Sequence, residues 1–503
     1  MAEPPLKLPP RGRRSFPLKL SSGRVDVAFR LMDNHVQRRR EFARTLGDGI
    51  AVIPAATEAV RNDDVDHEFR QDSDFFFLTG FHEPDAVAII DPTGEEEYVL
   101  FVRPRDREME IWDGYRAGVD GAKEQFGADE AFPVAELATE LRSRFEGRSA
   151  VHYRLGRRLD QEVLAAMSAV GGLANRYGLE APHTIVDPTP TLAAMRQLKT
   201  AAEAELLAKA AAISVKGHSE AMRVTQPGMY EYQTEAEMEA AFRRAGSPRN
   251  GYPSIVASGP NACILHYTEN DRLMADGDLL LIDAAAEYGY YSADITRTFP
   301  VNGTFTSPQR AIYEIALAAH QASIGAAQLG TPFKELTDVA VRVVSEGLVD
   351  LGLVPGSLDE TLEMHHYREY FMHGLGHWLG MDVHDAGPYR RNETSVALAE
   401  GMAFTVEPGV YVESNREEVE FSLHAYDLEG RYLRRMRLGA AKAKELEEAE
   451  VADATKVSHP VPEEFRGIGV RIEDDIAMTA AGPRNLTEEL PVSVEDIEAL
   501  CQS

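Results

Sequence analysis

Four acidic residues and one histidine stand out in this chain of 503 residues, because each lies in a short sequence segment of distinctive composition. Carboxylate oxygens combined with an imidazole nitrogen suit hard or borderline divalent metal ions. Five such side chains are enough to hold two ions side by side, and two ions can activate a water and polarise a carbonyl. The sequence therefore predicts a metallohydrolase with the ligands Asp283, Asp294, His377, Glu407 and Glu473.

The first two acids are predicted to lie on a hairpin. An apolar run that ends at Asp283 is typical of a buried strand, and the alternating segment 290–299 suits a second strand. If Tyr288 and Gly289 form the loop, Asp283 lies directly opposite Asp294, with Cβ atoms roughly 5 Å apart. Two carboxylates that close repel each other. A cation between them, a shared proton or a different hairpin register would each remove the repulsion.

The other three predicted ligands lie in separate phrases. His373 and His377 are four residues apart, as in the zinc motif H-E-x-x-H. The two glycines between them disfavour a helix, and no Glu follows the first His, so a zincin site is rejected. Glu407 ends a predicted strand, and the alternation of another predicted strand places Arg471 and Glu473 on one face.

These phrases resemble those of the Xaa-Pro aminopeptidases (aminopeptidase P), the relatives of prolidase, methionine aminopeptidase and creatinase. The resemblance implies an α+β protein, in which a C-terminal pita-bread catalytic domain follows a smaller α/β creatinase-type N-terminal domain. It covers most of the chain beyond about residue 35, and the similar segments occur in family order at 70–75, 79–81, 264–300, 373–385, 405–409 and 467–475.

The resemblance also implies roles for single residues. Asp283 is similar to a bidentate ligand of one ion, and Asp294 and Glu473 are similar to bridging carboxylates. His377 and Glu407 are similar to the ligands that complete the other ion, and Glu407 is also similar to a general base. Residues similar to those that contact the substrate or orient the ligands are His266, His373, His384, Arg471 and Tyr411.

The implied reaction is release of the N-terminal residue from peptides with proline in second position, by attack of a metal-bridging hydroxide. The resemblance implies two divalent ions, with Mn²⁺ expected and Co, Fe or Zn compatible with the same donors. Prolidase, which takes only dipeptides, is the nearest alternative. A metal-free creatinase-like enzyme and a non-catalytic binding protein agree less well with five intact ligand types.

Further expectations concern partners and location. A homodimer or homotetramer is expected. In the family, a tryptophan in a sequence segment similar to that around Trp112 reaches from one subunit into the active site of a neighbouring subunit. The net charge of −30, from 82 acidic and 52 basic residues, argues against nucleic acid or an anionic membrane as a partner. No apolar stretch is long enough to span a bilayer. Two cysteines cannot form a disulfide framework, which indicates a cytoplasmic protein.

The predicted organisation is a flexible arm at 1–30, the N-terminal domain at 31–195 and the catalytic domain at 196–503. A charged segment at about 413–462 is longer than the link typical of aminopeptidase P. It is expected to be a surface excursion that leaves the metal site intact, with a helix over 440–454.

Two helix starts are predicted from local signals. Thr200 and Glu203 form a capping box, which indicates a helix that continues to about Val224. A later helix is expected to begin with Ser307 as N-cap and Pro308 in the first turn. A further departure from the family is Gly376, where some relatives have serine.

Overall fold

The computed structural model describes residues 34–423, 434–453 and 455–503. The chain divides into two compact units between Pro188 and Thr189. The arm predicted at 1–30 lies outside the described residues. The boundary predicted after residue 195 falls within α7 (Thr189–Gln197), which belongs to the second unit.

The first unit, as far as it is described, contains a six-stranded mixed sheet in the order β6-β5-β4-β1-β7-β8. Its central strands are completely buried apolar runs, and α5 and α6 pack their apolar residues onto the same core. The strands are β1 (Ile50–Pro54), β4 (Val87–Ile90), β5 (Tyr98–Val102), β6 (Glu130–Pro133), β7 (Ala150–His152) and β8 (Thr184–Val186). The helices are α2 (Ser73–Thr79), α3 (Met109–Asp113), α4 (Gly118–Phe126), α5 (Leu137–Phe145) and α6 (Asp160–Tyr177), and β2 (Val60–Asn62) pairs with β3 (Val65–Asp66).

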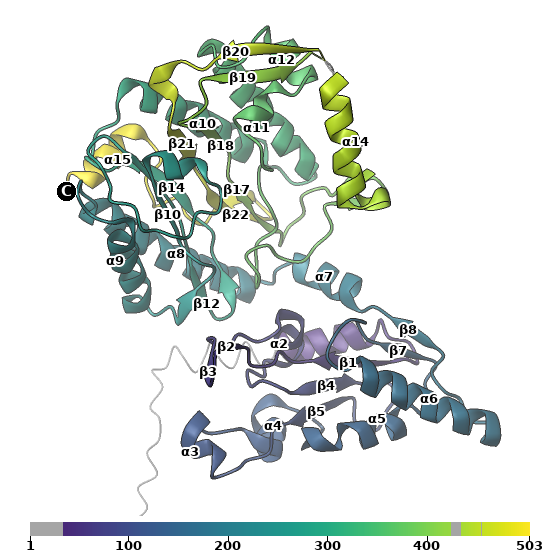
Figure 1. Cartoon of the computed structure of the whole chain (residues 1–503). Helices are drawn as coiled ribbons and strands as arrows, with labels where there is room; N and C mark the ends of the chain where they lie inside the picture. Colours follow the sequence, from purple (N-terminus) through teal and green to yellow (C-terminus); the bar gives the residue numbers. More distant parts are fainter. Residues whose placement is uncertain (1–33, 424–433, 454) are drawn as a thin grey trace, which may run out of the picture. The chain divides into compact units, whose positions relative to one another are not determined.

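The second unit holds several small antiparallel sheets that meet in one layer of buried strands (Figure 1). An isolated bridge between Thr296 and Glu473 joins strands from distant parts of the sequence. The sheets are β10 (Ile255–Ser258), β11 (Leu279–Asp283) and β14 (Thr296–Pro300); β17 (Ala403–Val406), β22 (Asp474–Thr479) and β23 (Gly482–Asn485); and β18 (Gly409–Val412) with β21 (Ile468–Arg471). Smaller pairings involve β9 (Arg249–Asn250), β12 (Ala286–Tyr288) and β13 (Tyr291–Ser292), and β15 (Arg390–Arg391) with β16 (Thr394–Ser395).

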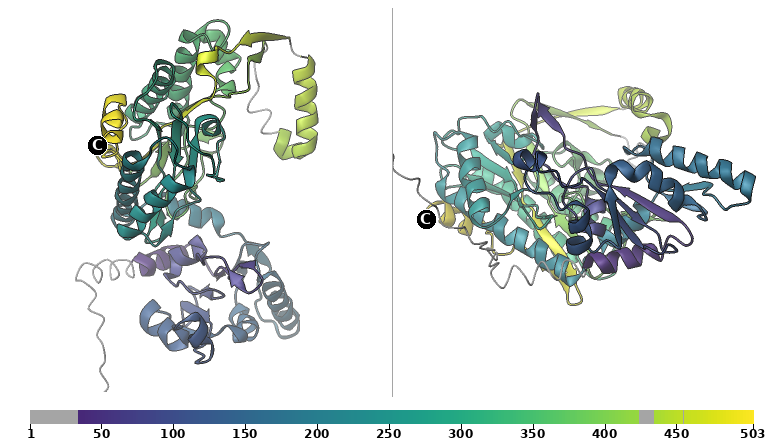
Figure 2. Two further views of the ribbon diagram at one scale, coloured as in Figure 1. Left: turned by 60° about the vertical axis from the view of Figure 1, so that its left-hand side comes forward. Right: turned by 90° about the horizontal axis from the view of Figure 1, so that it is seen from below.

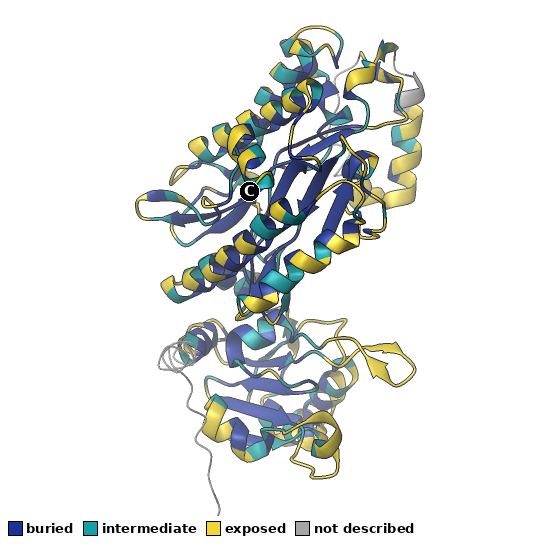
Figure 3. Ribbon diagram, turned by 90° about the vertical axis from the view of Figure 1, so that its left-hand side faces the viewer, coloured by how far each residue is buried: buried dark blue, intermediate teal, exposed yellow. Residues whose placement is uncertain are grey.

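Helices flank this layer as two packed pairs, α8 with α9 and α10 with α11 (Figure 1). Each of these four helices exposes its outer face to solvent, while the strands of the layer are buried (Figure 3). The bounds are α8 (Ala201–Val224), α9 (Glu231–Arg244), α10 (Ser307–Ala326), α11 (Phe333–Asp350), α12 (Leu358–Glu363) and α15 (Val494–Cys501). The capping box of Thr200 and Glu203 is confirmed. The N-cap of α10 is Thr306 rather than Ser307, because the Thr306 hydroxyl accepts the Gln309 amide.

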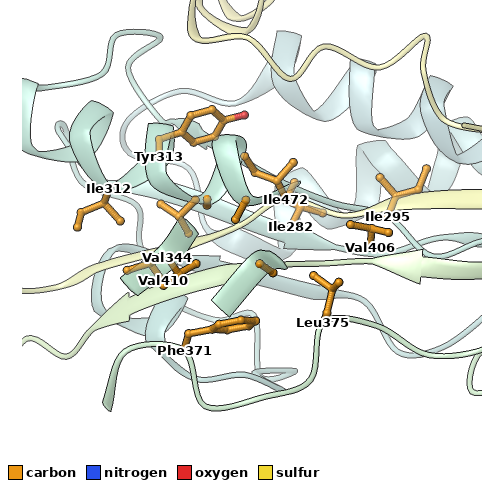
Figure 4. Close-up of a cluster of buried hydrophobic side chains, with 14 of the residues drawn as sticks. Ile282, Ile295, Ile312, Tyr313, Val344, Phe371, Leu375, Val406, Val410 and Ile472 are labelled. Atoms are coloured by element: carbon orange, nitrogen blue, oxygen red, sulfur yellow. The ribbon is translucent and has the colours of Figure 1, made fainter. Parts of the chain in front are cut away.

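The main core of the second unit lies against the strands that carry the predicted ligands (Figure 4). Ile282, Ile295, Val406 and Ile472 are all completely buried, and each is the sequence neighbour of one predicted acidic ligand. Because successive side chains of an extended chain point to opposite sides, burial of these four aliphatic residues turns the adjacent carboxylates the other way. The core therefore fixes the direction of the acids.

The excursion predicted at 413–462 contains β19 (Glu418–Ser422), α14 (Ala440–Asp453) and β20 (Lys456–Pro460), while 424–433 and 454 lie outside the described residues. β19 pairs with β20, with Ser422 opposite Lys456. The predicted helix is confirmed, and its described side chains are mostly exposed, with Ala443 buried. Figure 2 shows α14 beside, rather than within, the layer of strands.

Candidate metal centre and active site

The hairpin that carries the first two acids differs in register from the prediction. Asp283, at the end of β11, pairs with Thr296 and not with Asp294. The turn consists of Gly289 and Tyr290, with φ of 59° and 69°, so it is a two-residue turn with left-handed residues at both positions. Asp294 lies in the irregular gap between β13 and β14. The prediction that the two acids face each other directly was wrong.

The two carboxylates nevertheless share a neighbour, Tyr252. Its hydroxyl oxygen lies 2.7 Å from Asp283 Oδ1 and 2.6 Å from Asp294 Oδ1. A phenol has one proton, so it can donate to only one of them at a time. Burial and the nearby Asp294 raise the pKa of Asp283, with Arg471 opposing the shift. Tyr252 alone therefore cannot satisfy both carboxylates at once.

Three predicted ligands converge closely. One ligand atom from each of Asp294, His377 and Glu473 lies within 4.8 Å of the other two. His377 Nε2 is 3.2 Å from Asp294 Oδ2 and 3.7 Å from Glu407 Oε1. His377 Nδ1 lies 3.1 Å from the Trp378 carbonyl, which fixes Nδ1 as a donor and turns Nε2 toward the acids.

Burial of these acids has a large electrostatic cost. Burial raises the pKa of Glu407 to about 8, and burial together with Asp294 and Glu407 raises the pKa of Glu473 well above its ordinary value. For His377 burial favours the neutral ring, but the hydrogen bond to Asp294 together with the charges of Asp294 and Glu407 outweighs it and raises the pKa to about 9. Arg471 brings one positive charge, and its Nη2 donates to Asp283 Oδ2 at 2.6 Å.

The donor set therefore fits divalent metal ions. Two such ions would bring four positive charges to four carboxylates, of which Asp294 and Glu473 are buried and Asp283 and Glu407 are half-buried. Oxygen ligands with one imidazole match hard or borderline ions. The acids are already oriented for this, since Glu473 Oε2 accepts the Thr296 hydroxyl at 2.7 Å and Arg471 Nε lies 3.1 Å from the same hydroxyl.

A cavity of about 640 Å³ opens over these residues. All five predicted ligands line it, as do His266, His373, His384 and Arg471. The His384 ring meets the His377 ring edge-on, with centroids 4.2 Å apart. Burial lowers the pKa of His384 and, with Arg471, lowers that of His373 to about 3, so both rings are neutral near pH 7.

Tyr411 contacts the site from behind the cavity lining. His373 Nδ1 lies 2.7 Å from the Gly374 carbonyl and must carry the proton, so His373 Nε2 accepts from the Tyr411 hydroxyl at 2.9 Å. Arg471 Nη1 donates to the same hydroxyl at 3.0 Å. The prediction that Tyr411 and Arg471 lie near the ligands and the histidines agrees with this chain of hydrogen bonds.

Several residues of the site were not predicted from the sequence. Tyr252 contacts two acids, Thr296 holds Glu473, and Thr405 contacts the His377 loop through two hydrogen bonds: its hydroxyl accepts the His377 amide at 3.1 Å and its own amide donates to the His377 carbonyl at 2.9 Å. Their only sequence signal is an uncharged hydroxyl in or near an apolar strand, which is common in proteins.

Two family models match the chain. The model of metallopeptidase family M24 matches residues 205–480, and that of the aminopeptidase P N-terminal domain matches residues 35–153. The Xaa-Pro aminopeptidase of Haemophilus influenzae is 39% identical over 465 residues, which are 92% of this chain and 96% of that protein. The Escherichia coli Xaa-Pro aminopeptidase is 39% identical over 469 residues, with the same coverage.

The chain belongs to metallopeptidase family M24.

Solved structures agree with this M24 assignment. A Pseudomonas aeruginosa aminopeptidase structure has a TM-score of 0.83 and 41% identity, covering 93% of this chain and 98% of that one. A zinc-substituted Escherichia coli aminopeptidase P in complex with product has a TM-score of 0.82 and 39% identity, with the same coverage. The predicted pita-bread catalytic domain with a creatinase-type N-terminal domain is confirmed. All ten predicted site residues lie within the segment that the M24 model matches.

Proposed function

We propose that this M24 metallopeptidase is an Xaa-Pro aminopeptidase, which releases the N-terminal residue from peptides with proline in second position. The observation that supports it most directly is the convergence of Asp294, His377 and Glu473, with Glu407 and Asp283 beside them, at the base of one cavity. The relatives at 39% identity carry the name Xaa-Pro aminopeptidase, which favours this activity over that of prolidase.

Divalent metal ions would be held by Asp283, Asp294, His377, Glu407 and Glu473. When bound, they would lower the pKa of a water and polarise the scissile carbonyl. We propose two Mn²⁺ ions, since four carboxylates and one imidazole are donors that suit Mn²⁺. Zinc fits the same donors, and a zinc-substituted form is known for the Escherichia coli relative.

The chain's own residues supply proton transfer and orientation. Glu407 lies at the cavity surface with 19% of its side chain exposed, and we propose that its carboxylate accepts the proton of the attacking water. His266 and His384 line the same cavity, and we propose that they donate to an oxyanion that develops on the substrate carbonyl. His373 is held neutral and connects Tyr411 to the cavity.

The cavity also suits a substrate with proline in second position. Proline has no backbone N–H and a fixed φ, so its binding depends on shape and apolar contact rather than on hydrogen bonding at that nitrogen. Apolar side chains share the cavity lining with the charged groups, among them Pro253, Ile255, Leu265 and Val383.

We further propose a homodimer or homotetramer in the cytoplasm. Trp112 in α3 has 83% of its surface exposed, with Ile111 beside it at 74%, and such exposed apolar side chains commonly lie at interfaces. Cys263 and Cys501 are both free, in agreement with a reducing compartment. No helix in the described part of the chain combines the length and apolar character needed to cross a bilayer.

The substrate proposal is tested by peptide length. The metal-loaded enzyme is assayed on an Xaa-Pro dipeptide and on an Xaa-Pro-Yaa-Yaa tetrapeptide of the same first residue. Release of the first residue from the tetrapeptide supports the proposal, whereas cleavage restricted to the dipeptide would identify a prolidase. Full activity after removal of metal by chelation would favour the creatinase-like alternative instead.

The ligand assignment is tested with Asp294→Asn and Glu473→Gln, which keep shape but remove one buried charge. Both variants should lose bound metal and nearly all activity. Glu203→Gln is a matched control, because Glu203 is a buried acid that caps α8 and does not line the cavity. Metal content near that of the wild type in either ligand variant would refute the assignment.

A further inference from the structure

The segment Gly380–Asp385 carries His384 to the metal centre without a regular helix or strand of its own. Its position therefore depends on side chains and on single backbone bonds. The Asp385 amide donates to the Trp378 carbonyl at 2.8 Å, and the Gly380 carbonyl accepts the Ser292 amide at 2.9 Å. The residue next to His384, Asp385, is almost completely buried, with 1% of its side chain exposed.

Two cations surround the Asp385 carboxylate. Lys199 Nζ lies 2.9 Å from Oδ2, and Arg196 Nη2 lies 2.6 Å from Oδ1. Both cationic side chains are at least as enclosed as a core residue, with 2% and 5% exposed. Arg196 also pairs with Asp382 of the same segment at 2.5 Å. Asp382 is exposed at 40% of its side chain, so the buried part of the cluster is Asp385 with its two cations. Buried charges that are paired and hydrogen-bonded in this way are held in one geometry.

Lys199 is itself anchored beside the strand that leads to a predicted ligand. The Lys199 amide donates to the Gly401 carbonyl at 2.7 Å, just before β17, and β17 leads directly to Glu407. Gly380 allows the acid to approach, because a Cβ atom at that position would lie 2.1 Å from Asp385 Oδ2. The position of the Asp385 segment is thus set relative to the metal centre by Lys199 and Arg196.

We propose that Asp385, held by Lys199 and Arg196, is a positioning residue that sets the place of the His384 imidazole over the metal centre. The inference rests on the proposed function, in which His384 contacts the reacting carbonyl. It assigns no contact with substrate to Asp385, Lys199 or Arg196.

The metal ligand in the same stretch has anchors of its own outside this cluster. His377 is tied to β17 directly, since its amide donates to the Thr405 hydroxyl at 3.1 Å and its carbonyl accepts the Thr405 amide at 2.9 Å. Loss of one cation should therefore displace His384 while His377 and bound metal stay in place. This separation distinguishes a positioning role from general support of the fold.

The test is a double-mutant cycle with Lys199→Met and His384→Ala in the full-length, metal-loaded enzyme. Lys199→Met should lower kcat about 10-fold, because small misplacement of a group that acts on the reacting atoms is costly, with KM and metal content unchanged. His384→Ala should lower kcat about 100-fold. The double variant should be no slower than His384→Ala alone. Losses that multiply to about 1,000-fold would overturn the proposal.

A measurement independent of activity separates this proposal from the proposed function. Hydrogen exchange of the peptide that contains Asp385 should become faster in Lys199→Met, while peptides from β17 keep their protection. Unchanged exchange would overturn the positioning role, even if Xaa-Pro cleavage is confirmed. Faster exchange together with no cleavage of any Xaa-Pro peptide by the wild type would leave the positioning intact and reject the proposed activity.

Two further variants control for loss of stability. Arg148→Met removes a similar pair in the first unit, where Arg148 Nη2 lies 2.7 Å from the buried Asp91, and it should leave kcat unchanged. Gly380→Ala keeps every charge but places a Cβ against the Asp385 carboxylate, so it should reproduce the loss of kcat seen with Lys199→Met. Wild-type kcat in Gly380→Ala, or an equal loss in Arg148→Met, would contradict the proposal.

Discussion

Hydroxyl groups hold the buried acids of this site in place. The phenol of Tyr252 contacts Asp283 and Asp294, and the hydroxyl of Thr296 donates to Glu473 while lying within reach of Arg471. These hydroxyls add to the contacts with Arg471 and His377 that orient Asp283 and Asp294. Preoriented ligands need less reordering when a metal ion binds, which favours both affinity and a defined geometry.

The raised pKa values of two ligands predict a pH dependence of metal binding. In the metal-free protein His377 has a pKa of about 9 and Glu407 a pKa of about 8, so both carry a proton at pH 7. A metal ion must displace these protons. Affinity should therefore rise as pH increases from 6 toward 9, by roughly 10-fold per pH unit for each proton released.

Calorimetric titration of the metal-free protein checks this at several pH values. Buffers of different ionisation enthalpy would report the number of protons released at each pH. An affinity that is constant between pH 6 and 8 would contradict the protonated state of both residues. The pKa of Glu473 is also raised well above its ordinary value, so proton release from this ligand should add to the number counted.

Close packing between elements positions the loop that carries His266. The helical turn Gly259–Cys263 lies against β21, and a Cβ atom added to Gly469 would lie 2.3 Å from the Ala262 carbonyl oxygen. Gly469→Ala should therefore push this turn away, lower the free energy of unfolding by roughly 1–3 kcal/mol and reduce kcat/KM through His266. Urea unfolding and the peptide assay would measure the two effects.

Gly325→Ala is the control for that substitution, because Gly325 lies in α10 and has open space where the Cβ would be placed. It should leave stability unchanged or increase it slightly, since alanine favours a helix. Equal destabilisation by both substitutions would show that the close approach at Gly469 is not the cause.

The excursion should be dispensable for catalysis. The Leu423 amide donates to the Thr455 carbonyl at 2.9 Å, so the ends of β19 and β20 are already side by side. Replacing residues 424–454 with Asn-Gly would close them with a two-residue turn. We expect kcat/KM to be unchanged and the free energy of unfolding to change by about 1 kcal/mol or less.

Light scattering of the shortened chain would show whether the excursion contributes to assembly. An unchanged mass places the subunit contacts elsewhere. The shortened chain should still bind metal and cleave the peptide, whatever its mass. Loss of either property would contradict the expectation that the excursion does not contribute to the metal centre.

The ligand types and the elements around them could be predicted from the sequence, but the hairpin geometry could not. Asp283 at a strand end and Glu407 before Pro-Gly were recognisable from short phrases, and so was the helix that begins after Thr200. The register was missed because Tyr290 adopts φ of 69°, which residues other than glycine rarely do. The cluster around Asp385 was missed because its partners are 186 or more residues away.

At the scale of the whole molecule, the predicted ligands all belong to the second unit, whereas the first unit has its own sheet and core. Metal binding should therefore stabilise one unit only. Scanning calorimetry should show two transitions, and EDTA should lower the midpoint temperature of one of them by about 5 °C. A shift of this size is expected when an ion whose free concentration was 100 times its Kd is removed. A single transition that shifts as a whole would contradict independent unfolding of the units.

The spread of the ligands along the chain has a consequence for biosynthesis. The centre needs both Asp283 and Glu473, which lie far apart in the sequence, and Glu473 reaches its place through a bridge to Thr296. A nascent polypeptide on the ribosome therefore lacks a complete set of donors until the segment that carries Glu473 has emerged and paired. Full coordination of an ion must follow the folding of these distant segments rather than guide the first of them.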